Sequence, residues 1–225
     1  MKTLPRLALL ALALLPSCKV VSDFQYTPPE QLEVLPQNER IVNADFDQTW
    51  SALISSVGKS FFAINEFEKA SGLLTLQFTT SPFSESVTGG HCTFKYDNSA
   101  MVDGQLFWNG IQGKKIKIDF DGDYADYTEQ YLSGSLAGAV NLIVTEVDSA
   151  HTRITVNTRF TVVSSATNPT TGGVSITTFS WNSGDRSRKI VTTAAGEQEA
   201  RIMQSTHFVE QKILDAIDEI FAMQQ

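Results

Sequence analysis

The feature that most constrains the fold is an alternation of apolar and charged residues in the middle of the chain. Ile116, Ile118, Phe120 and Tyr124 alternate with the charged residues Lys115, Lys117, Asp119, Asp121 and Asp123. A period of two places alternate side chains on opposite faces of a strand, so that one face packs on a core and the other faces solvent. Residues 136–147 and 153–163 predict two further strands joined by a turn at residues 148–151.

Other segments predict shorter β elements. Residues 62–67 and 73–79 read as two strands around a turn at residues 69–72, and 174–181 and 187–193 read as a hairpin around residues 182–185. Between them, residues 80–112 are punctuated by glycines and predict a long excursion with one or two short strands.

Two segments show helical periodicity instead. The first places Trp50, Leu53, Ile54, Val57 and Phe61 on one apolar stripe, with Asp47 as its N-cap and Asp45 close by. The second runs from about residue 197 to 223, and its stripe consists of Ile202, Val209, Ile213, Ala216, Ile217 and Ile220.

This order of elements predicts an α+β fold, in which a curved antiparallel sheet packs on a long C-terminal helix with a second, N-terminal helix. The layout resembles the helix-grip fold. Phe46-Asp47-Gln48-Thr49-Trp50, Phe62-Ala63-Ile64-Asn65 and Lys69-Ala70-Ser71-Gly72-Leu73 are similar to the repeated domain of BamC-like (NlpB-like) outer-membrane lipoproteins. The resemblance covers residues 40–80 and, more weakly, the last helix.

The N-terminus has the order of a secretory leader. Lys2 and Arg6 precede the apolar run Leu7–Leu15, which is far shorter than the about 20 residues that a membrane-spanning helix needs. Leu15-Pro16-Ser17-Cys18 resembles the lipobox of bacterial lipoproteins, in which cleavage occurs before a cysteine that carries diacylglycerol. An ordinary signal peptide with a chance cysteine is the alternative. By the same resemblance, Lys19 favours the outer membrane over the inner membrane, because an aspartate there favours inner-membrane retention.

We therefore expect residues 1–17 to be a lipoprotein signal peptide, 18–39 a flexible tether from lipidated Cys18, and 40–225 a single domain. Pro28, Pro29 and Pro36 argue against a packed element in the tether.

Composition limits the partners. The formal net charge is −8, and the leader holds two cations and no carboxylate, so the mature chain is more acidic still. That charge argues against a nucleic-acid partner, which needs a basic face. With Cys18 acylated, Cys92 would have no second cysteine within the chain; it would be a partly buried thiol or form an intermolecular disulfide.

Candidate chemistry is sparse. The run Asp119–Asp126 has Tyr124 and Gln130 where an EF-hand loop needs Gly and Glu, so a solvated strand face is favoured over a calcium site. His91-Cys92 offers two ligands where zinc needs three or four. Gly134-Ser135-Leu136-Ala137-Gly138 lacks the central serine of a nucleophile elbow. We expect no enzyme activity, no cofactor and no metal.

Two further groups are surface candidates. Phe107 and Trp108 are either a partner contact or a plug against the sheet, and Lys114, Lys115 and Lys117 read as a solvated strand face. The function expected is a lipid-anchored, periplasm-facing envelope module that binds a protein partner through its excursion or an exposed sheet edge. The alternative is a binding module for a small apolar ligand or lipid in a cleft between the sheet and the C-terminal helix.

Overall fold

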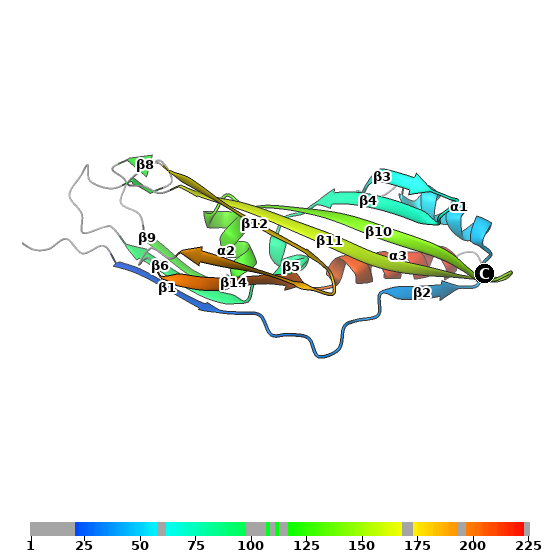
Figure 1. Ribbon diagram of the computed structural model, residues 1–225, viewed down its shortest axis with the longest axis horizontal. Helices are drawn as coiled ribbons and strands as arrows, with labels where there is room; N and C mark the ends of the chain where they lie inside the picture. Colours follow the sequence, from blue (N-terminus) through cyan, green and yellow to red (C-terminus); the bar gives the residue numbers. More distant parts are fainter. Residues whose placement is uncertain are drawn as a thin grey trace, which may run out of the picture.

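Figure 1 shows the computed structural model as an elongated molecule whose longest strands run along its long axis. The structure describes residues 21–57, 62–97, 107–108, 111–112, 117–167, 173–192 and 197–222. The helices are α1 (Phe46–Val57), α2 (Tyr124–Tyr131) and α3 (Phe208–Ala222), with a 3-10 turn, η1 (Phe83–Glu85). The strands are β1 (Val21–Thr27), β2 (Glu39–Val42), β3 (Ala63–Glu68), β4 (Leu73–Thr79), β5 (Val87–Thr88), β6 (His91–Asp97), β7 (Phe107–Trp108), β8 (Ile111–Gln112), β9 (Lys117–Asp123), β10 (Ser135–Asp148), β11 (His151–Thr167), β12 (Val174–Asn182), β13 (Arg186–Thr192) and β14 (Gln198–Ser205).

The central sheet has the strand order β12-β11-β10-β4-β3, with β2 pairing the far end of β11, and all its pairs are antiparallel. Between residues 136 and 144 of β10 and between residues 152 and 164 of β11 every second residue is buried. Helices α1 and α3 contact these strands and each other, and they cover the buried face. The core between them is mostly aliphatic and also holds the buried rings of Phe78, Phe160 and Phe179. Its fully buried aliphatic side chains include Leu74, Leu76, Val140, Leu142, Ile154, Val156, Leu214 and Ile217.

One glycine on β10 is required by packing. Gly138 pairs with Phe78 on β4 and with Phe160 on β11, and the Phe78 ring covers the space that a Cβ would need. A Cβ added to Gly138 would lie 2.2 Å from that ring. The glycine therefore lets two aromatic rings meet edge to face, with centroids 6.3 Å apart.

The opposite end of the molecule, which we call the aromatic end, has a different core. It combines the sheet β1-β6-β9, the sheet β13-β14-β5 and helix α2. Phe24, Phe94, Phe120 and Tyr127 contact one another there, with ring centroids 5.3–6.2 Å apart. At its centre Arg201, which is only 4% exposed, lies over the rings of Phe24, Tyr26 and Tyr124 and pairs with Glu199 at 2.6 Å.

The expected fold class is wrong. Strands make up 55% and helices 23% of a mostly β structure with three helices and several antiparallel sheets, not one curved sheet packed on a long C-terminal helix. The main cause is the C-terminal segment: residues 198–205 form β14, and α3 begins only at Phe208. Arg201, Met203 and Ser205 are all buried at a period of two, and His207, with φ +61°, separates strand from helix.

The prediction of no packed element in residues 19–39 is wrong for β1, whose seven residues pair with β6. Phe24 and Tyr26 face the aromatic core, and the Tyr26 hydroxyl accepts a hydrogen bond of 2.9 Å from the Ile202 amide. The segment between β1 and β2 is also bound at both ends. Gln204 Nε2 donates to the Glu30 carbonyl at 2.8 Å, and Gln211 Nε2 donates to the Gln37 carbonyl at 2.8 Å.

The predicted hairpin of residues 174–193 is also wrong, because its two strands belong to different sheets. β12 pairs with β11 and β13 pairs with β14. The Ser183 amide bonds the Thr158 carbonyl at 2.8 Å, so the chain follows β11 past the expected turn. It then bends at residues 183–185 and crosses from the central sheet into the aromatic end.

Smaller differences concern capping. Asp45, rather than Asp47, accepts the Gln48 amide at the start of α1, at 2.8 Å. The irregular excursion expected at residues 80–112 contains β6, a seven-residue strand, together with η1, β5, β7 and β8. Helix α2 has no counterpart in our sequence reading.

Candidate functional site

Apart from its edge strand β3, on which Glu66 and Glu68 pair with Thr75 and Leu73 of β4, the outer face of the central sheet, opposite α1 and α3, is nearly free of charge. It consists of the residues that alternate with the buried ones on β4, β10, β11 and β12. Only two of these outward positions are charged, Arg153 and Arg159. This count covers β4 and residues 135–145 of β10, 153–165 of β11 and 176–182 of β12. The others are Leu73, Thr75, Gln77, Thr79, Ser135, Ala137, Ala139, Asn141, Ile143, Thr145, Thr155, Asn157, Thr161, Val163, Ser165, Ile176, Thr178, Ser180 and Asn182.

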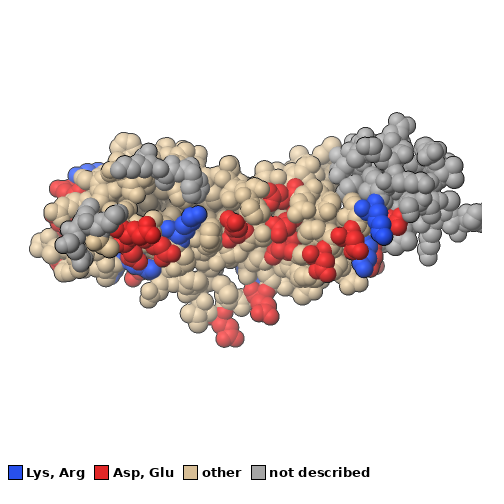
Figure 2. Space-filling model, turned by 180° about the vertical axis from the view of Figure 1, so that it is seen from behind, with Lys and Arg blue, Asp and Glu red and all other residues tan. Residues whose placement is uncertain are grey.

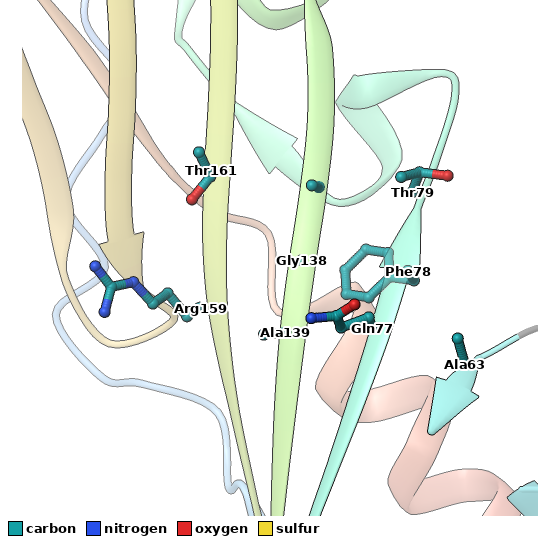
Figure 3. A pocket seen from close by; sticks show the side chains of 9 residues that line it. Ala63, Gln77, Phe78, Thr79, Gly138, Ala139, Arg159 and Thr161 are labelled. Atoms are coloured by element: carbon teal, nitrogen blue, oxygen red, sulfur yellow. The ribbon is translucent and has the colours of Figure 1, made fainter. Parts of the chain in front are cut away.

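A trough crosses this face, as Figure 3 shows. The strand register puts Ala137 between Thr79 and Thr161, and Ala139 between Gln77 and Arg159. Two alanines around Gly138 therefore form a low floor, and longer side chains on β4 and β11 form the walls. The open depression has a volume of about 480 Å³.

The walls supply polar groups of both kinds. In Figure 3 the Gln77 amide leans over Ala139, whereas Arg159 extends away from β10 toward β12. Arg153 lies 3.7 Å from Glu39, but Arg159 has no ion pair among the described residues. Arg159 is therefore an exposed cation that can turn toward a group seated in the trough.

The helical side of the molecule differs in charge. Asp215, Asp218 and Glu219 are exposed on α3, and Glu30 and Glu33 are exposed on the segment that precedes β2. Figure 2 shows acidic side chains gathered over the middle of the face that it draws. The outer face of the central sheet is thus the charge-poor side of an acidic protein.

The structure separates the residues of the suggested metal pair. His91 is exposed and its Nε2 lies 2.7 Å from Asp121 Oδ1, while Cys92 is fully buried on the opposite face of β6. Burial, with a smaller contribution from the Asp123 charge, raises the pKa of the Cys92 thiol to about 12. Such a thiol is neither a ready metal ligand nor accessible for an intermolecular disulfide in the folded protein.

The acidic run of residues 119–126 has a structural role at its centre. Asp123 caps α2 by accepting the Ala125 amide at 2.7 Å, and it also accepts the Gly89 amide at 2.9 Å and the Thr88 hydroxyl at 2.5 Å. Among the described residues, no three His, Cys, Asp or Glu side chains converge as a metal site would require.

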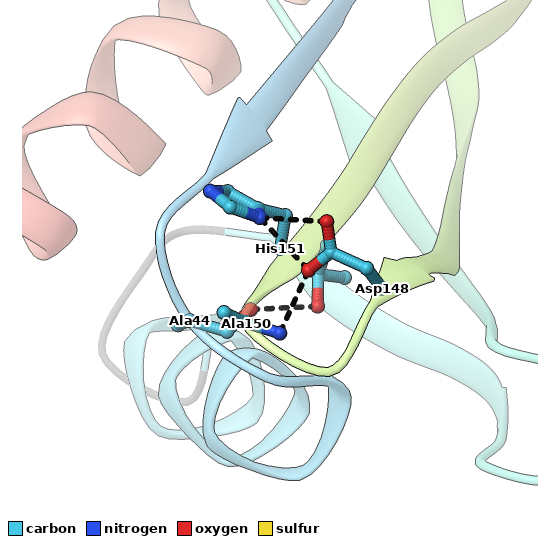
Figure 4. Close-up of polar contacts among 5 residues, drawn as sticks. Ala44, Asp148, Ala150 and His151 are labelled. Atoms are coloured by element: carbon cyan, nitrogen blue, oxygen red, sulfur yellow. Dashed lines mark hydrogen bonds and ion pairs between the residues drawn. The ribbon is translucent and has the colours of Figure 1, made fainter.

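A second polar cluster lies at the tip of the β10–β11 turn, drawn in Figure 4. Asp148 accepts the Ala150 amide at 2.8 Å and lies 2.8 Å from His151 Nδ1, while the Thr152 hydroxyl donates to the Ala44 carbonyl at 2.9 Å. The amide, and after it His151, hold the pKa of Asp148 below its ordinary value. The hydrogen bonds of this cluster stabilise the turn.

Several candidates of the sequence lie outside the described part of the chain. The structure does not describe Cys18, the rest of the leader, Lys114 or Lys115. Phe107 and Trp108 form β7, which pairs with β8, but their side chains are not described. Ser135 of the suggested elbow lies at the start of β10 and is not presented on a strand-to-helix turn.

No family model, no curated protein and no solved structure matches this chain. The resemblance to BamC-like lipoproteins therefore stays a prediction, and the site must be argued from its own geometry. None of the described helices has the length and apolar content needed to cross a bilayer.

The trough was missed by sequence reasoning because it depends on register. Ala137-Gly138-Ala139 is visible in the sequence as a run of small residues, but its neighbours Gln77 and Arg159 are fixed only by pairing across three strands. The one available signal was the lack of charge at alternate positions of the two long strands.

Proposed function

We propose that the protein is a lipid-anchored, periplasm-facing envelope lipoprotein of the outer membrane that acts as a protein-interaction module, and that it docks its partner on the outer face of the central sheet. The observation that carries the docking surface is the charge-poor outer face in an otherwise acidic protein. Cores of protein–protein interfaces are depleted of charged residues and keep polar groups and arginine at defined points. Arg159 beside the trough fits that pattern.

The shape of the surface favours a protein partner over a small molecule. Pockets for small ligands enclose most of the ligand, whereas the trough is open and floored by alanines. The apolar-ligand alternative needs a cleft between the sheet and α3. There the described side chains of Val156, Phe160, Leu214 and Ile217 are at most 2% exposed and fill the space.

Charge also describes the partner. A segment that inserts an uncharged or acidic side chain into the trough meets Gln77, Thr161 and Arg159. A basic segment would be attracted instead to the helical side, where Asp215, Asp218 and Glu219 are exposed. The two sides thus predict two different binding preferences.

Site-specific photo-crosslinking in cells tests the docking surface. A photoreactive residue at Thr161 should give a defined crosslinked species, and the same residue at Asp215 on α3 should not. Substituting Ala139→Arg, which fills the trough from the solvent side, should abolish the Thr161 crosslink while the melting temperature stays unchanged. A crosslink that survives Ala139→Arg, or one that forms at Asp215 alone, would contradict the proposed surface.

A further inference from the structure

We infer that the end of the domain where β1 begins is held against the bilayer surface, with the β10–β11 turn pointing away from it. The inference rests on the proposed lipid anchor at Cys18. It replaces the expected long tether by a contact between this end of the domain and lipid headgroups.

Only a short length of chain connects the anchor at Cys18 to the first strand of the fold. β1 begins at Val21 and is paired from that residue onward with Asp97 of β6. Three peptide units separate Val21 from Cys18, and consecutive Cα atoms are at most 3.8 Å apart, so the two Cα atoms lie within about 11 Å of each other. A lipidated Cys18 is held at the headgroup level, so the start of β1 stays close to that level.

Aromatic residues also lie at the end where β1 begins. Figure 1 places the β7–β8 pair and the start of β9 at the same end of the long axis as the start of β1. β7 consists of Phe107 and Trp108, and aromatic residues of this kind are enriched at membrane–water interfaces. The sequence predicted these two residues to be either a partner contact or a plug against the sheet, and the bilayer is a partner of suitable chemistry for the first of these roles.

The charges of this end of the domain also suit a bilayer surface. β9 begins at Lys117, which pairs with Asp97, and Lys95 lies between Asp119 and Asp23 of the neighbouring strands, so two lysines face three aspartates among the described charges at this end. In the sequence Lys114 and Lys115 fall within three residues of Lys117 and add positive charge. An end that is neutral or positive approaches anionic headgroups without the repulsion that the acidic helical side would meet.

The consequence is a defined orientation. β11 has 17 residues, which at about 3.3 Å per residue span roughly 55 Å along the molecule. The turn at residues 148–151 lies at the opposite end of the long axis from the start of β1 (Figure 1). The long axis would then rise from the bilayer surface, and the outer face of the central sheet would point sideways, where a partner can approach it parallel to the membrane.

Fluorescence quenching by labelled lipid tests this orientation. The full-length protein from membranes is reconstituted in vesicles of phosphatidylethanolamine and phosphatidylglycerol that carry nitroxide-labelled lipid. A fluorophore is attached to Lys117→Cys at the anchored end or to Ser149→Cys at the far end; the buried Cys92 thiol contributes no background. We expect loss of most of the fluorescence at position 117 and no loss at position 149. Equal quenching at the two positions, or stronger quenching at 149, overturns the orientation.

A second variant tests the cause. Inserting about 20 Gly and Ser residues after Lys19 adds a flexible chain with an end-to-end distance of about 25 Å, so quenching at position 117 should fall toward that at 149. Unchanged quenching at 117 would overturn the short connection as its cause. Mass spectrometry of the N-terminal peptide and labelling of Cys18 by the fluorophore report separately on the anchor. An unmodified Cys18 would contradict the proposed function, whereas a lipidated Cys18 with no difference between the positions contradicts the orientation alone.

Discussion

The central sheet and the aromatic end reach the same degree of burial by different chemistry. The central sheet is built around the long consecutive strands β10, β11 and β12, and its core combines aliphatic side chains with the buried rings of Phe78, Phe160 and Phe179. The aromatic end brings together segments as distant as β1 and β14, and its core is a set of rings, most of them tilted or edge to face, packed around one buried cation. Cross-strand pairing alone specifies the first, whereas the second depends on particular side chains that join separate sheets.

This difference teaches where the fold is vulnerable. In the central sheet, the loss of one side chain leaves a cavity within an intact strand ladder. In the aromatic end, Arg201 contacts rings on β1 and at the start of α2, and Tyr26 bonds the backbone of β14. Single substitutions there should therefore loosen one element from another.

The largest effects should come from one substitution in each core. Leu142→Ala in the central sheet should cost about 2–5 kcal/mol of unfolding free energy through cavity formation. Arg201→Ala should cost about 2–4 kcal/mol through lost cation–π contacts and lost packing of its stem. Chemical denaturation measures both, and Arg188→Ala, at an exposed position of β13, serves as the control with little change.

Hydrogen exchange distinguishes the two variants. Arg201→Ala should raise the exchange of β1 and β14 amides while β10 and β11 stay protected, and Leu142→Ala should affect β10 and β11. If both variants raise exchange uniformly over the molecule, the two cores are one cooperative unit and the comparison fails.

A smaller loss is expected from the cap of α2. Asp123→Ala removes the acceptor for the Ala125 and Gly89 amides and the Thr88 hydroxyl, and should cost about 1–3 kcal/mol. Asp119→Ala, which removes an exposed carboxylate from the neighbouring strand β9, is the control in the denaturation experiment. An Asp123→Ala protein as stable as the control would show that these bonds are replaced by water.

The Cys92 thiol should be nearly inert in the folded aromatic end. Burial and the nearby Asp123 raise its pKa to about 12, so folding favours the protonated thiol, and stability falls progressively as pH rises from the ordinary value of 9.0 to about 12. Alkylation at pH 8 should be slower on the order of a hundredfold or more than in denaturant. Rates that match in the two conditions would show that β6 opens readily.

The smallest effect concerns the turn at the far end of the central sheet. Because the pKa of Asp148 lies below 3.8, its contribution to stability is present above that pH and is lost as pH falls through the lowered value. His151→Ala should raise the pKa of Asp148 only part of the way, since the Ala150 amide is the larger cause. An NMR titration of the Asp148 carboxyl measures this; complete return to the ordinary value would show that His151 dominates.

Sequence patterns predicted the central sheet well because local periodicity specifies it. The strands expected at residues 136–147 and 153–163 are present as β10 and β11, and those expected around the turn at 69–72 are present as β3 and β4. Helix α1 follows its predicted stripe from Trp50 to Val57. The pairs β3–β4 and β10–β11 are each formed by consecutive strands, whereas the pairing of β4 with β10 and the packing of α1 on α3 join distant parts of the chain.

In the aromatic end the alternation at residues 116–124 correctly predicted β9, but β1, β14 and α2 were missed because the contacts that hold them are non-local. Phe24 and Tyr26 show a short alternation before Pro28 that the prolines obscured, and Ile202 fits a helical stripe by coincidence while Arg201 and Met203 are the buried residues. The helix α2 was announced only by Asp123, a cap residue within what read as a strand. The trough was hidden for the same reason, since residues of three strands define it.

The central claim, that a lipid on Cys18 anchors this domain to a membrane, is tested most directly by mass spectrometry of the N-terminal peptide of the protein extracted from its native membranes. The account predicts a mature chain that begins at Cys18 and carries diacylglyceryl and fatty-acyl groups. A mature chain that begins at another residue, or at an unmodified Cys18, would contradict it.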